Sequence, residues 1–236
     1  MSRSRAGAGP EHVVAGPEDV TPLVERVLAL LARSADALPG RAGRVMIGVA
    51  GPPGAGKSTL TEVLATALAA AGAASAVVGM DGYHLAQAEL VRLGRADRKG
   101  APDTFDADGY VSLVRRIRVQ RPGAGVVYAP AFDRHLEEPV AGAVPVAADV
   151  PVVLTEGNYL LLPDEPWDRL ADLLDETWYL ETDDAGRRAR LVARHVAHGR
   201  SPAAAAEWES RSDQRNAEVV AAARDRADVL VRWRER

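Results

Sequence analysis

The sequence predicts an α/β fold with a doubly wound parallel sheet. Short apolar runs typical of buried strands alternate with segments in which apolar residues recur at helical spacing. A glycine-rich stretch, Gly51-Pro52-Pro53-Gly54-Ala55-Gly56-Lys57-Ser58, follows the first strong strand and fits the phosphate-loop pattern G-x-x-x-x-G-K-[ST]. Ligands of such sheets bind at the carboxyl ends of the strands. We therefore expect the chemistry at that edge.

Length and composition limit the class of protein. The 236 residues fit one α/β domain, and no apolar run approaches the ~18 residues of a membrane span. A net charge of -4 argues against nonspecific binding of nucleic acid, and the absence of cysteine excludes disulfides and thiol chemistry. We expect a cytoplasmic protein without membrane or nucleic-acid partners.

The N-terminal part of the chain predicts a tail, a helix and a strand. Residues 1–18 lack the apolar segment of a secretory signal and predict a mobile tail. A single domain would then span residues 19–236. Thr21 can cap a leading helix over residues 21–38, with Pro22 at its first position. The apolar run at residues 44–50 predicts a strand that is covered on both faces.

The remaining elements continue this alternation. Strands are expected at residues 75–81, 152–155, 176–182 and 227–233, and helices at 85–95, 109–120, 167–175, 184–199, 202–208 and 213–223. Residues 95–108, rich in Gly, Pro and Asp, predict an active-site loop, with Asp106 or Asp108 as the next helix cap. The runs 126–128 and 140–146 predict a peripheral hairpin-like excursion.

The glycine-rich loop is suited to holding phosphate, because its small residues let backbone N–H groups turn inward around a polyphosphate. The following helix would direct its N-terminal dipole at the same anion. Lys57 would reach the β- and γ-phosphates and Ser58 the Mg²⁺, unless the stretch is only a surface turn. The expected nucleotide-binding residues are Gly51, Gly54, Ala55, Gly56, Lys57, Ser58 and Thr59.

Polar side chains at other strand ends supply candidates for a reaction. Asp81 follows the second strand and could orient a substrate hydroxyl and accept its proton; a helix cap or a ligand of Mg²⁺-bound water is the alternative. Glu156 follows a buried strand, and its carboxylate could be one of the groups around Mg²⁺. Alternatively, it could lie at a helix N-terminus, where the helix dipole favours an acidic side chain. Arg187, Arg190 and Arg194 share one helix face, either a lid over the polyphosphate or a salt-bridged surface stripe.

Six segments together carry a resemblance to a known family: GPPGAGKST, DGYHL, GAPDTFD, PAFDR, EGNYLLL and SDQRNAEVV. As a set they resemble the bacterial nucleoside/nucleotide kinase-like P-loop kinases, a group with uridine kinase, phosphoribulokinase and type I pantothenate kinase. Kinases associated with fructose transport look most similar. The resemblance covers about residues 44–233. It implies a P-loop nucleoside triphosphate hydrolase/kinase fold with a helical lid at about residues 184–212.

The resemblance also implies ATP, Mg²⁺ and transfer of the γ-phosphate to a hydroxyl of a nucleoside or sugar-like metabolite. Asp81 matches the family's catalytic base and Glu156 the acid near the metal. Arg190 and Arg194 fall in the lid, and with Lys57 they complete the expected catalytic set. A homodimer is a family-level expectation. Segments that relatives place around the acceptor contain His84, Lys99, Asp103, Asp106, Phe132, Asp133 and Arg134.

Two alternatives stay open. The lid and the PAFDR segment differ from those of characterised uridine and pantothenate kinases. The resemblance therefore does not assign either uridine or pantothenate as the acceptor. Pantothenate kinase-like activity is favoured if Lys99 or Arg134 holds a substrate carboxylate. A nucleotide-dependent switch or regulatory ATPase is the alternative of another class. The sequence lacks the N-K-x-D guanine signature, and Asp81 with the polar insert supplies a second-substrate pocket that a switch does not need.

Overall fold

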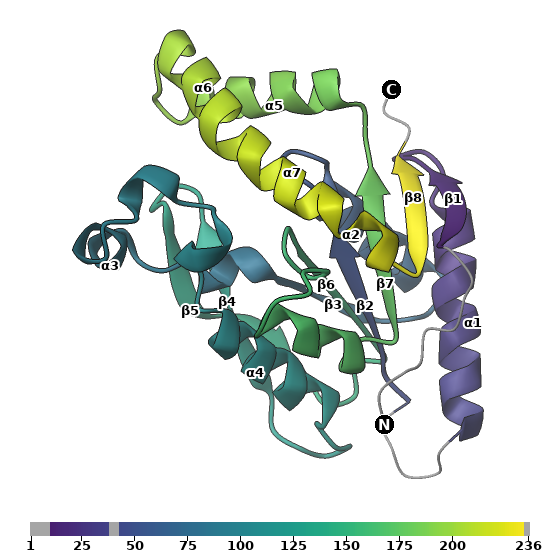
Figure 1. Cartoon of the computed structure of the whole chain (residues 1–236). Helices are drawn as coiled ribbons and strands as arrows, with labels where there is room; N and C mark the ends of the chain where they lie inside the picture. Colours follow the sequence, from purple (N-terminus) through teal and green to yellow (C-terminus); the bar gives the residue numbers. More distant parts are fainter. Residues whose placement is uncertain (1–9, 38–42, 234–236) are drawn as a thin grey trace.

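A six-stranded parallel sheet forms the centre of the computed structural model, which describes residues 10–37 and 43–233 (Figure 1). The strand order is β1-β8-β7-β2-β6-β3, and each neighbouring pair is parallel. Because neighbours in the sheet are mostly distant in sequence, crossovers connect them, and the predicted doubly wound α/β class is confirmed. The strands are β1 (Glu11–Ala15), β2 (Val45–Ala50), β3 (Ser75–Gly79), β6 (Val152–Gly157), β7 (Glu176–Glu181) and β8 (Val229–Trp233).

Helices cover both faces of this sheet. One face packs against α1 (Thr21–Ala37) and α2 (Lys57–Ala70), and the other against α4 (Ala107–Arg118), a 3₁₀ helix (Trp167–Asp172) and α7 (Gln214–Ala222). Where a longer helix was expected at residues 167–175, only this 3₁₀ helix forms. Within the ranges that the structure describes, no helix is long and apolar enough to cross a membrane.

Strand β2 shows how the sequence fills two cores. Val45, Ile47 and Val49 belong to the hydrophobic cluster under α1 and α2. Met46 and Ala50 belong to the cluster on the opposite face. Successive side chains of a strand point to opposite faces, so a strand buried on both sides is apolar throughout. This explains why residues 44–50 read as a continuous apolar run.

The outer strand β1 corrects the prediction of a tail through residue 18. Residues Glu11–Ala15 pair in parallel with β8, with Glu11 opposite Val229 and Ala15 opposite Trp233. Only a short apolar stretch marks this strand, and its partner lies at the other end of the chain. No local pattern could therefore reveal the pairing. The part of the expected tail at residues 1–9 lies outside the described residues.

Helix caps agree closely with the sequence pattern. The Asp106 side chain accepts a hydrogen bond from the N–H of Gly109 at the start of α4. The hydroxyl of Ser201 accepts from the N–H of Ala204 and caps α6 (Pro202–Trp208), at the start of the helix expected there. At the leading helix the prediction is wrong: Thr21 is the first helical residue rather than the cap, and its N–H donates to the carboxylate of Asp19, which precedes the helix. Position 38, the expected end of that helix, lies outside the described residues.

The segment between β3 and β6 contains several elements besides α4 that lie outside the main sheet. It begins with a 3₁₀ turn at residues 80–83, continues through α3 (Gln87–Arg92) and two further 3₁₀ turns, and leads into α4. Two strands, β4 (Val127–Asp133) and β5 (Glu138–Val146), then form a separate antiparallel sheet. The expected hairpin-like excursion is confirmed, and its first strand continues five residues past the apolar run, from 128 to 133.

The lid segment, residues 184–212, follows β7. It comprises α5 (Asp184–Ala197), α6 and most of a π-helix (Glu209–Asp213) that runs on into α7. Figure 1 shows α5 and α6 beyond the carboxyl ends of β7 and β8, on the same side of the molecule as the edge where ligands are expected.

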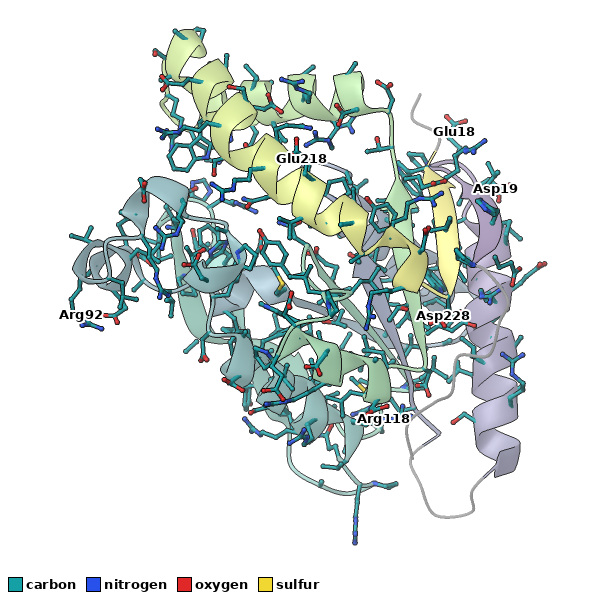
Figure 2. All side chains as sticks on the ribbon, in the orientation of Figure 1. Glu18, Asp19, Arg92, Arg118, Glu218 and Asp228 are labelled. Atoms are coloured by element: carbon teal, nitrogen blue, oxygen red, sulfur yellow. The ribbon has the colours of Figure 1, made fainter. Side chains whose placement is uncertain are left out.

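Side-chain links tie the sheet to its surroundings, and Figure 2 labels two residues that make them. Arg118 of α4 donates two hydrogen bonds to the carboxylate of Asp175, which precedes β7. Asp228 precedes β8 and accepts from the backbone N–H and the hydroxyl of Thr177. These links fix the start of β7, and the phosphate loop and lid segment occupy the opposite end.

Candidate active site

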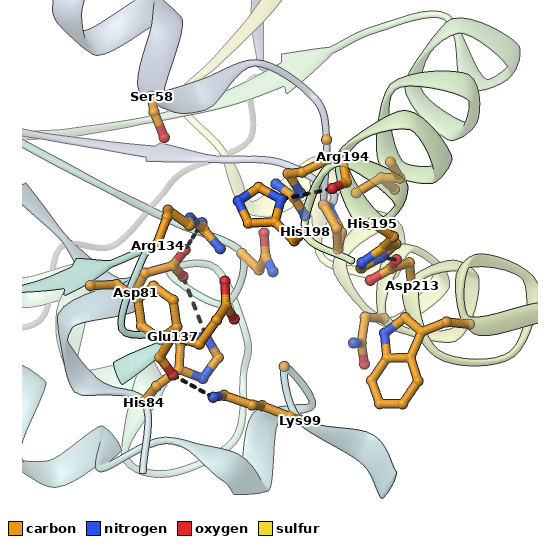
Figure 3. A pocket seen from close by; sticks show the side chains of 18 of the residues that line it. Ser58, Asp81, His84, Lys99, Arg134, Glu137, Arg194, His195, His198 and Asp213 are labelled. Atoms are coloured by element: carbon orange, nitrogen blue, oxygen red, sulfur yellow. Dashed lines mark hydrogen bonds and ion pairs between the residues drawn. The ribbon is translucent and has the colours of Figure 1, made fainter. Parts of the chain in front are cut away.

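A cavity of about 960 Å³ lies at the carboxyl ends of β2, β3 and β6 (Figure 3). Several parts of the chain line it: the phosphate loop with the start of α2, the start of α3, the insert at residues 95–108 with the turn before it, the end of β4 with the turn into β5, the end of β6, and the lid segment with the start of α7. Its size is at the upper end of the range of about 300–1,000 Å³ for small-molecule sites. The cavity can therefore hold a nucleotide and a small second substrate.

The phosphate loop needs glycine at two positions. Gly54 and Gly56 have φ angles of 75° and 93°, in the left-handed region that favours glycine. A Cβ atom on Gly54 would lie 2.7 Å from Cγ of Leu191 in α5, so the loop and the lid segment are in contact here. The helix α2 begins at Lys57, directly after the loop, and brings its N-terminus to the cavity.

The expected nucleotide-binding residues fall into two groups. Gly51 and Ala55 are buried beneath the cavity and shape the loop without lining the space. The others line the cavity: Gly54, Gly56, Lys57, Ser58 and Thr59.

Lys57 is buried at the start of α2, and its ammonium group donates three hydrogen bonds. Two go to the loop carbonyls of Gly51 (3.0 Å) and Pro52 (3.1 Å), and the third goes to Oδ1 of Asn158 (2.7 Å). Burial lowers the pKa of Lys57, and the neighbouring Glu156 carboxylate opposes this shift. The ammonium group is thus held beside the loop by mainly neutral partners, and an anion would bind it more strongly.

Ser58 and Glu156 form a pair of oxygen ligands between α2 and β6. The Ser58 hydroxyl donates to Oε1 of Glu156 at 3.1 Å. Burial and the negative charge of Asp81 raise the pKa of Glu156. A hydroxyl and a carboxylate are ligands that suit Mg²⁺. Among the residues that the structure describes, no three His, Asp or Glu side chains form a metal cage of their own.

Asp81 lies in the 3₁₀ turn after β3, and its carboxylate contacts two neighbours (Figure 3). Nη2 of Arg134 donates to Oδ2 at 3.0 Å, and Nε2 of His84 lies 3.8 Å from Oδ1. Burial lowers the pKa of His84 to about 4, so its imidazole is neutral at pH 7. The His84 ring stacks against Phe105, with the centroids 4.0 Å apart. Asp81 itself remains 34% exposed and open to the cavity.

Four of the seven expected acceptor-binding residues line the cavity: His84, Lys99, Phe132 and Arg134. The structure gives the other three local contacts instead. Asp103 accepts from Arg98, Asp106 caps α4, and Asp133 accepts from two backbone N–H groups of the following turn. These three carboxylates lie outside the cavity lining, and a local ion pair, a helix cap and a turn already use them.

The arginines of α5 turn toward the phosphate loop, as their helical spacing predicts. Arg187 is 1% exposed, donates to the carbonyl of Pro53 at 3.2 Å and also binds Gln214. Arg190 donates to the carbonyl of Gly54 at 3.1 Å. Arg187 is therefore part of the framework that joins the phosphate loop to the lid segment, whereas Arg190 lies in the cavity wall.

Arg194 lines the cavity on the next turn of α5. No residue that the structure describes accepts a hydrogen bond from its guanidinium group. Burial lowers the pKa of Arg194, and the positive charge of Arg134 adds to this shift. The carboxylates of Asp213 and Asp81 act in the opposite direction, and the hydrogen-bond donors of the guanidinium group remain available to an anion in the cavity. By contrast, Arg188 of the same helix binds the buried Glu209.

The cavity lining includes further residues that the sequence analysis does not place in the site, among them Asn158, His195 and Asp213. Asn158 lines the cavity and binds Lys57; its position directly after the Glu156-Gly157 pair could have indicated this. His195 and Asp213 form a pair at 2.7 Å on the lid side of the cavity. The π-helix at residues 209–213 sets the direction of Asp213, and no sequence pattern marks such a helix.

Comparison with protein families gives one partial match. The model of the family "Methylmalonyl Co-A mutase-associated GTPase MeaB" matches residues 21–85. This range runs from α1 through the phosphate loop to the turn that carries Asp81. The match covers less than half of the chain, so it indicates a shared phosphate-loop region.

Individual relatives match more of the chain. An ATP-dependent kinase-like protein of Aspergillus versicolor is 42% identical, over 54% of this chain and 77% of the relative. A protein of Schizosaccharomyces pombe, named as a candidate uridine kinase, is 38% identical over 66% of this chain and 68% of its own. A solved structure from Silicibacter sp. TM1040, described as a candidate fructose transport system kinase, is 37% identical. It covers 90% of this chain and 98% of its own, with a TM-score of 0.77.

Proposed function

Because this chain belongs to the uridine kinase-like P-loop kinases, we propose that it transfers the γ-phosphoryl group of ATP to a hydroxyl of a small metabolite, nucleoside or sugar-like. One observation carries the proposal. The Asp81 carboxylate opens into the same cavity as Lys57 and Ser58 of the phosphate loop. A phosphate site and a candidate base for a second substrate thus share one space.

The phosphate end of the cavity would bind ATP. Backbone N–H groups of the loop and the Lys57 ammonium would hold the β- and γ-phosphates. Ser58 and Glu156 are the residues that would hold Mg²⁺, and their oxygen ligands fit that ion. When bound, Mg²⁺ neutralises part of the phosphate charge.

The acceptor end would position the hydroxyl. Its oxygen attacks the γ-phosphorus and forms the new P–O bond, while the bond to the β,γ-bridging oxygen breaks and ADP leaves. Asp81 orients the hydroxyl and takes its proton. Arg194 has no hydrogen-bond acceptor among the described residues, and Arg190 lies beside it in the wall; both would stabilise the charge on the transferring group.

A second candidate function is a nucleotide-dependent switch, and the match of residues 21–85 to a GTPase family favours it. Such a protein would hydrolyse nucleotide slowly and independently of metabolites. A switch makes no use of Asp81 as a base for a second substrate. The two functions therefore predict different responses to an acceptor panel.

The decisive experiment measures ADP release from MgATP with nucleosides, ribose and fructose derivatives, pantothenate and aminoglycosides. We expect one class of acceptor to raise turnover well above the background, and Asp81→Asn to lose that increase. Glu218→Gln changes an exposed acid of α7 outside the cavity and is the matched control. If no compound changed the rate and Asp81→Asn matched the wild type, the switch would replace the kinase as the better explanation.

A further inference from the structure

Two cationic side chains from different parts of the chain flank one aromatic ring in the cavity. Nζ of Lys99 lies 5.4 Å from the ring centroid of Phe132, and Cζ of Arg134 lies 4.9 Å from it. The insert supplies Lys99, and the end of β4 supplies the ring. Cation–π contacts hold both positive groups on one small surface, which we call the Lys99–Arg134 patch.

Most hydrogen-bond donors of this patch have no partner in the part of the chain that the structure describes. Lys99 donates one hydrogen bond, to the carbonyl of Glu137 at 2.8 Å. Arg134 donates one, to Asp81 at 3.0 Å. An ammonium group carries three donors and a guanidinium group five. The patch therefore offers several donors and positive charge to a bound group.

Among the described residues at this end of the cavity, Asp81 pairs with Arg134, and the two neighbouring glutamates leave Lys99 without an ion-pair partner. Glu138 accepts the backbone N–H of Gln87 through Oε1. Glu137 is exposed and offers Lys99 its neutral carbonyl. Across the described ranges, no carboxylate lies within ion-pair distance of Lys99. An anion would form charge-assisted hydrogen bonds here, whereas a neutral sugar or nucleoside would leave this cation without a counter-charge.

The patch is separate from the groups that would serve ATP. Arg190 and Lys57 contact the phosphate loop itself. In Figure 3, Asp81 and Arg134 lie between Ser58 and Lys99. A group bound at Lys99 would thus lie beyond the proposed base, on the side of the acceptor.

We propose that the acceptor carries an anionic group, a carboxylate or a phosphate monoester, that binds between Lys99 and Arg134. The same anion competes with Asp81 for the Arg134 guanidinium and so frees the carboxylate to orient the acceptor hydroxyl. This inference rests on the proposed kinase activity and narrows its substrate class to hydroxy acids and sugar phosphates.

Compounds that differ mainly in the anionic group provide the test. The sets are glycerol, glycerate and glycerol 3-phosphate; ribose and ribose 5-phosphate; and panthenol and pantothenate. ADP release from MgATP gives kcat/KM, and calorimetry with a non-hydrolysable ATP analogue gives binding to the nucleotide-loaded protein. We expect an anionic member to exceed its neutral counterpart at least tenfold in kcat/KM. Preference for carboxylate or phosphate identifies which anion the patch binds.

Variants of the patch connect this preference to the residues. Lys99→Met and Arg134→Met should each raise KM for the anionic acceptor at least tenfold, with Lys99→Arg restoring part of the affinity. KM for ATP should stay within about twofold, because neither residue contacts the phosphate loop. Arg92→Met is the control: Figure 2 shows Arg92 on the outside of α3, where it pairs with Glu89 away from the cavity.

Either of two results would overturn the inference. One is a neutral acceptor that is phosphorylated as well as its anionic counterpart, which leaves the kinase proposal intact. The other is that no anionic compound binds the nucleotide-loaded protein. Failure of the kinase proposal looks different, because no compound, neutral or anionic, would then raise ADP release above that of Asp81→Asn.

Discussion

The hydroxyl of Ser58 donates a 3.1 Å hydrogen bond to Oε1 of Glu156, although 98 positions separate the two residues. Ser58 is at the start of α2 and Glu156 at the end of β6, a strand that pairs with both β2 and β3. The parallel sheet brings the two oxygens together at its carboxyl edge. This pair is the candidate magnesium site, and its contribution can be measured directly.

Replacing Glu156 with glutamine should weaken the use of Mg²⁺. An amide oxygen is a poorer ligand than a carboxylate, so the Mg²⁺ concentration for half-maximal activity should rise about tenfold or more. Activity is measured against Mg²⁺ at fixed ATP. Glu89→Gln, an exposed acid that pairs with Arg92, should leave the curve unchanged. An unchanged curve for Glu156→Gln would remove this residue from the metal site.

Lys57→Met should reduce the stabilisation that the protein gains from nucleotide binding. At a ligand concentration of 100 Kd, MgADP stabilises a folded protein by about 2.7 kcal/mol, which corresponds to a rise in Tm of about 5–10 °C at this chain length. The variant should lose more than half of that rise, because the ammonium group beside the loop is missing. Differential scanning fluorimetry with and without MgADP checks this. An equal rise in both proteins would show that Lys57 does not bind the phosphates.

Arg187→Ala should act on stability. This side chain is 1% exposed and joins the carbonyl of Pro53, Gln214 and Asp184. Its removal leaves the buried carbonyl of Pro53 and the partly buried oxygen of Gln214 without this donor and should lower the free energy of unfolding by about 3 kcal/mol. Urea denaturation measures this, with Arg92→Ala as the surface control within about 0.5 kcal/mol of the wild type. A loss below 1 kcal/mol would contradict the framework role.

Arg194→Ala should act on turnover. Its guanidinium lines the cavity without a hydrogen-bond acceptor among the described residues, so its removal should change the free energy of unfolding by less than about 1 kcal/mol. If it stabilises the transferring phosphoryl group, kcat should fall about 100-fold or more. Steady-state kinetics and urea denaturation on the same preparation separate the two effects. A normal kcat would contradict a role for Arg194 in phosphoryl transfer.

His84 should make stability depend on pH in the acidic range. Burial lowers its pKa from 6.5 to about 4, so the unfolded chain binds one more proton between these values. Stability should therefore fall as the pH decreases from 6.5 toward 4, with a contribution from this residue of about 2 kcal/mol at pH 5. Urea denaturation gives the free energy of unfolding at pH 5 and pH 7. The difference between these two values should be smaller for His84→Gln than for the wild type. Equal pH differences in both proteins would contradict this assignment.

Much of the fold was predictable because its signals are local. The apolar run of β2, the phosphate loop and the caps Asp106 and Ser201 are each decided by a few neighbouring residues. Strand β1 was missed because its stability comes from pairing with β8. The 3₁₀ form of residues 167–172 was missed for a related reason, since Trp167 and Leu170 are buried by tertiary packing.

The candidate site was predictable where motifs mark it and unpredictable where contacts define it. The loop motif marks Lys57 and Ser58, and the ends of strands mark Asp81 and Glu156. All four residues line the cavity. Local sequence could not show that an ion pair with Arg98 uses Asp103 and that a turn uses Asp133, so that neither lines the cavity. It also could not separate the three arginines of α5, which share a helix face but differ in their partners.

By itself, the sequence determined the α/β class, the phosphate loop and the acidic residues after the strands, because these depend on periodicity and on glycine at particular backbone positions. The tertiary structure alone decided which charges meet. Folding placed Lys99 and Arg134 on one ring, joined Arg187 to the loop and left Arg194 without a hydrogen-bond acceptor among the described residues. Such electrostatic relationships depend on distances between segments far apart in the chain, and no local pattern encodes those distances.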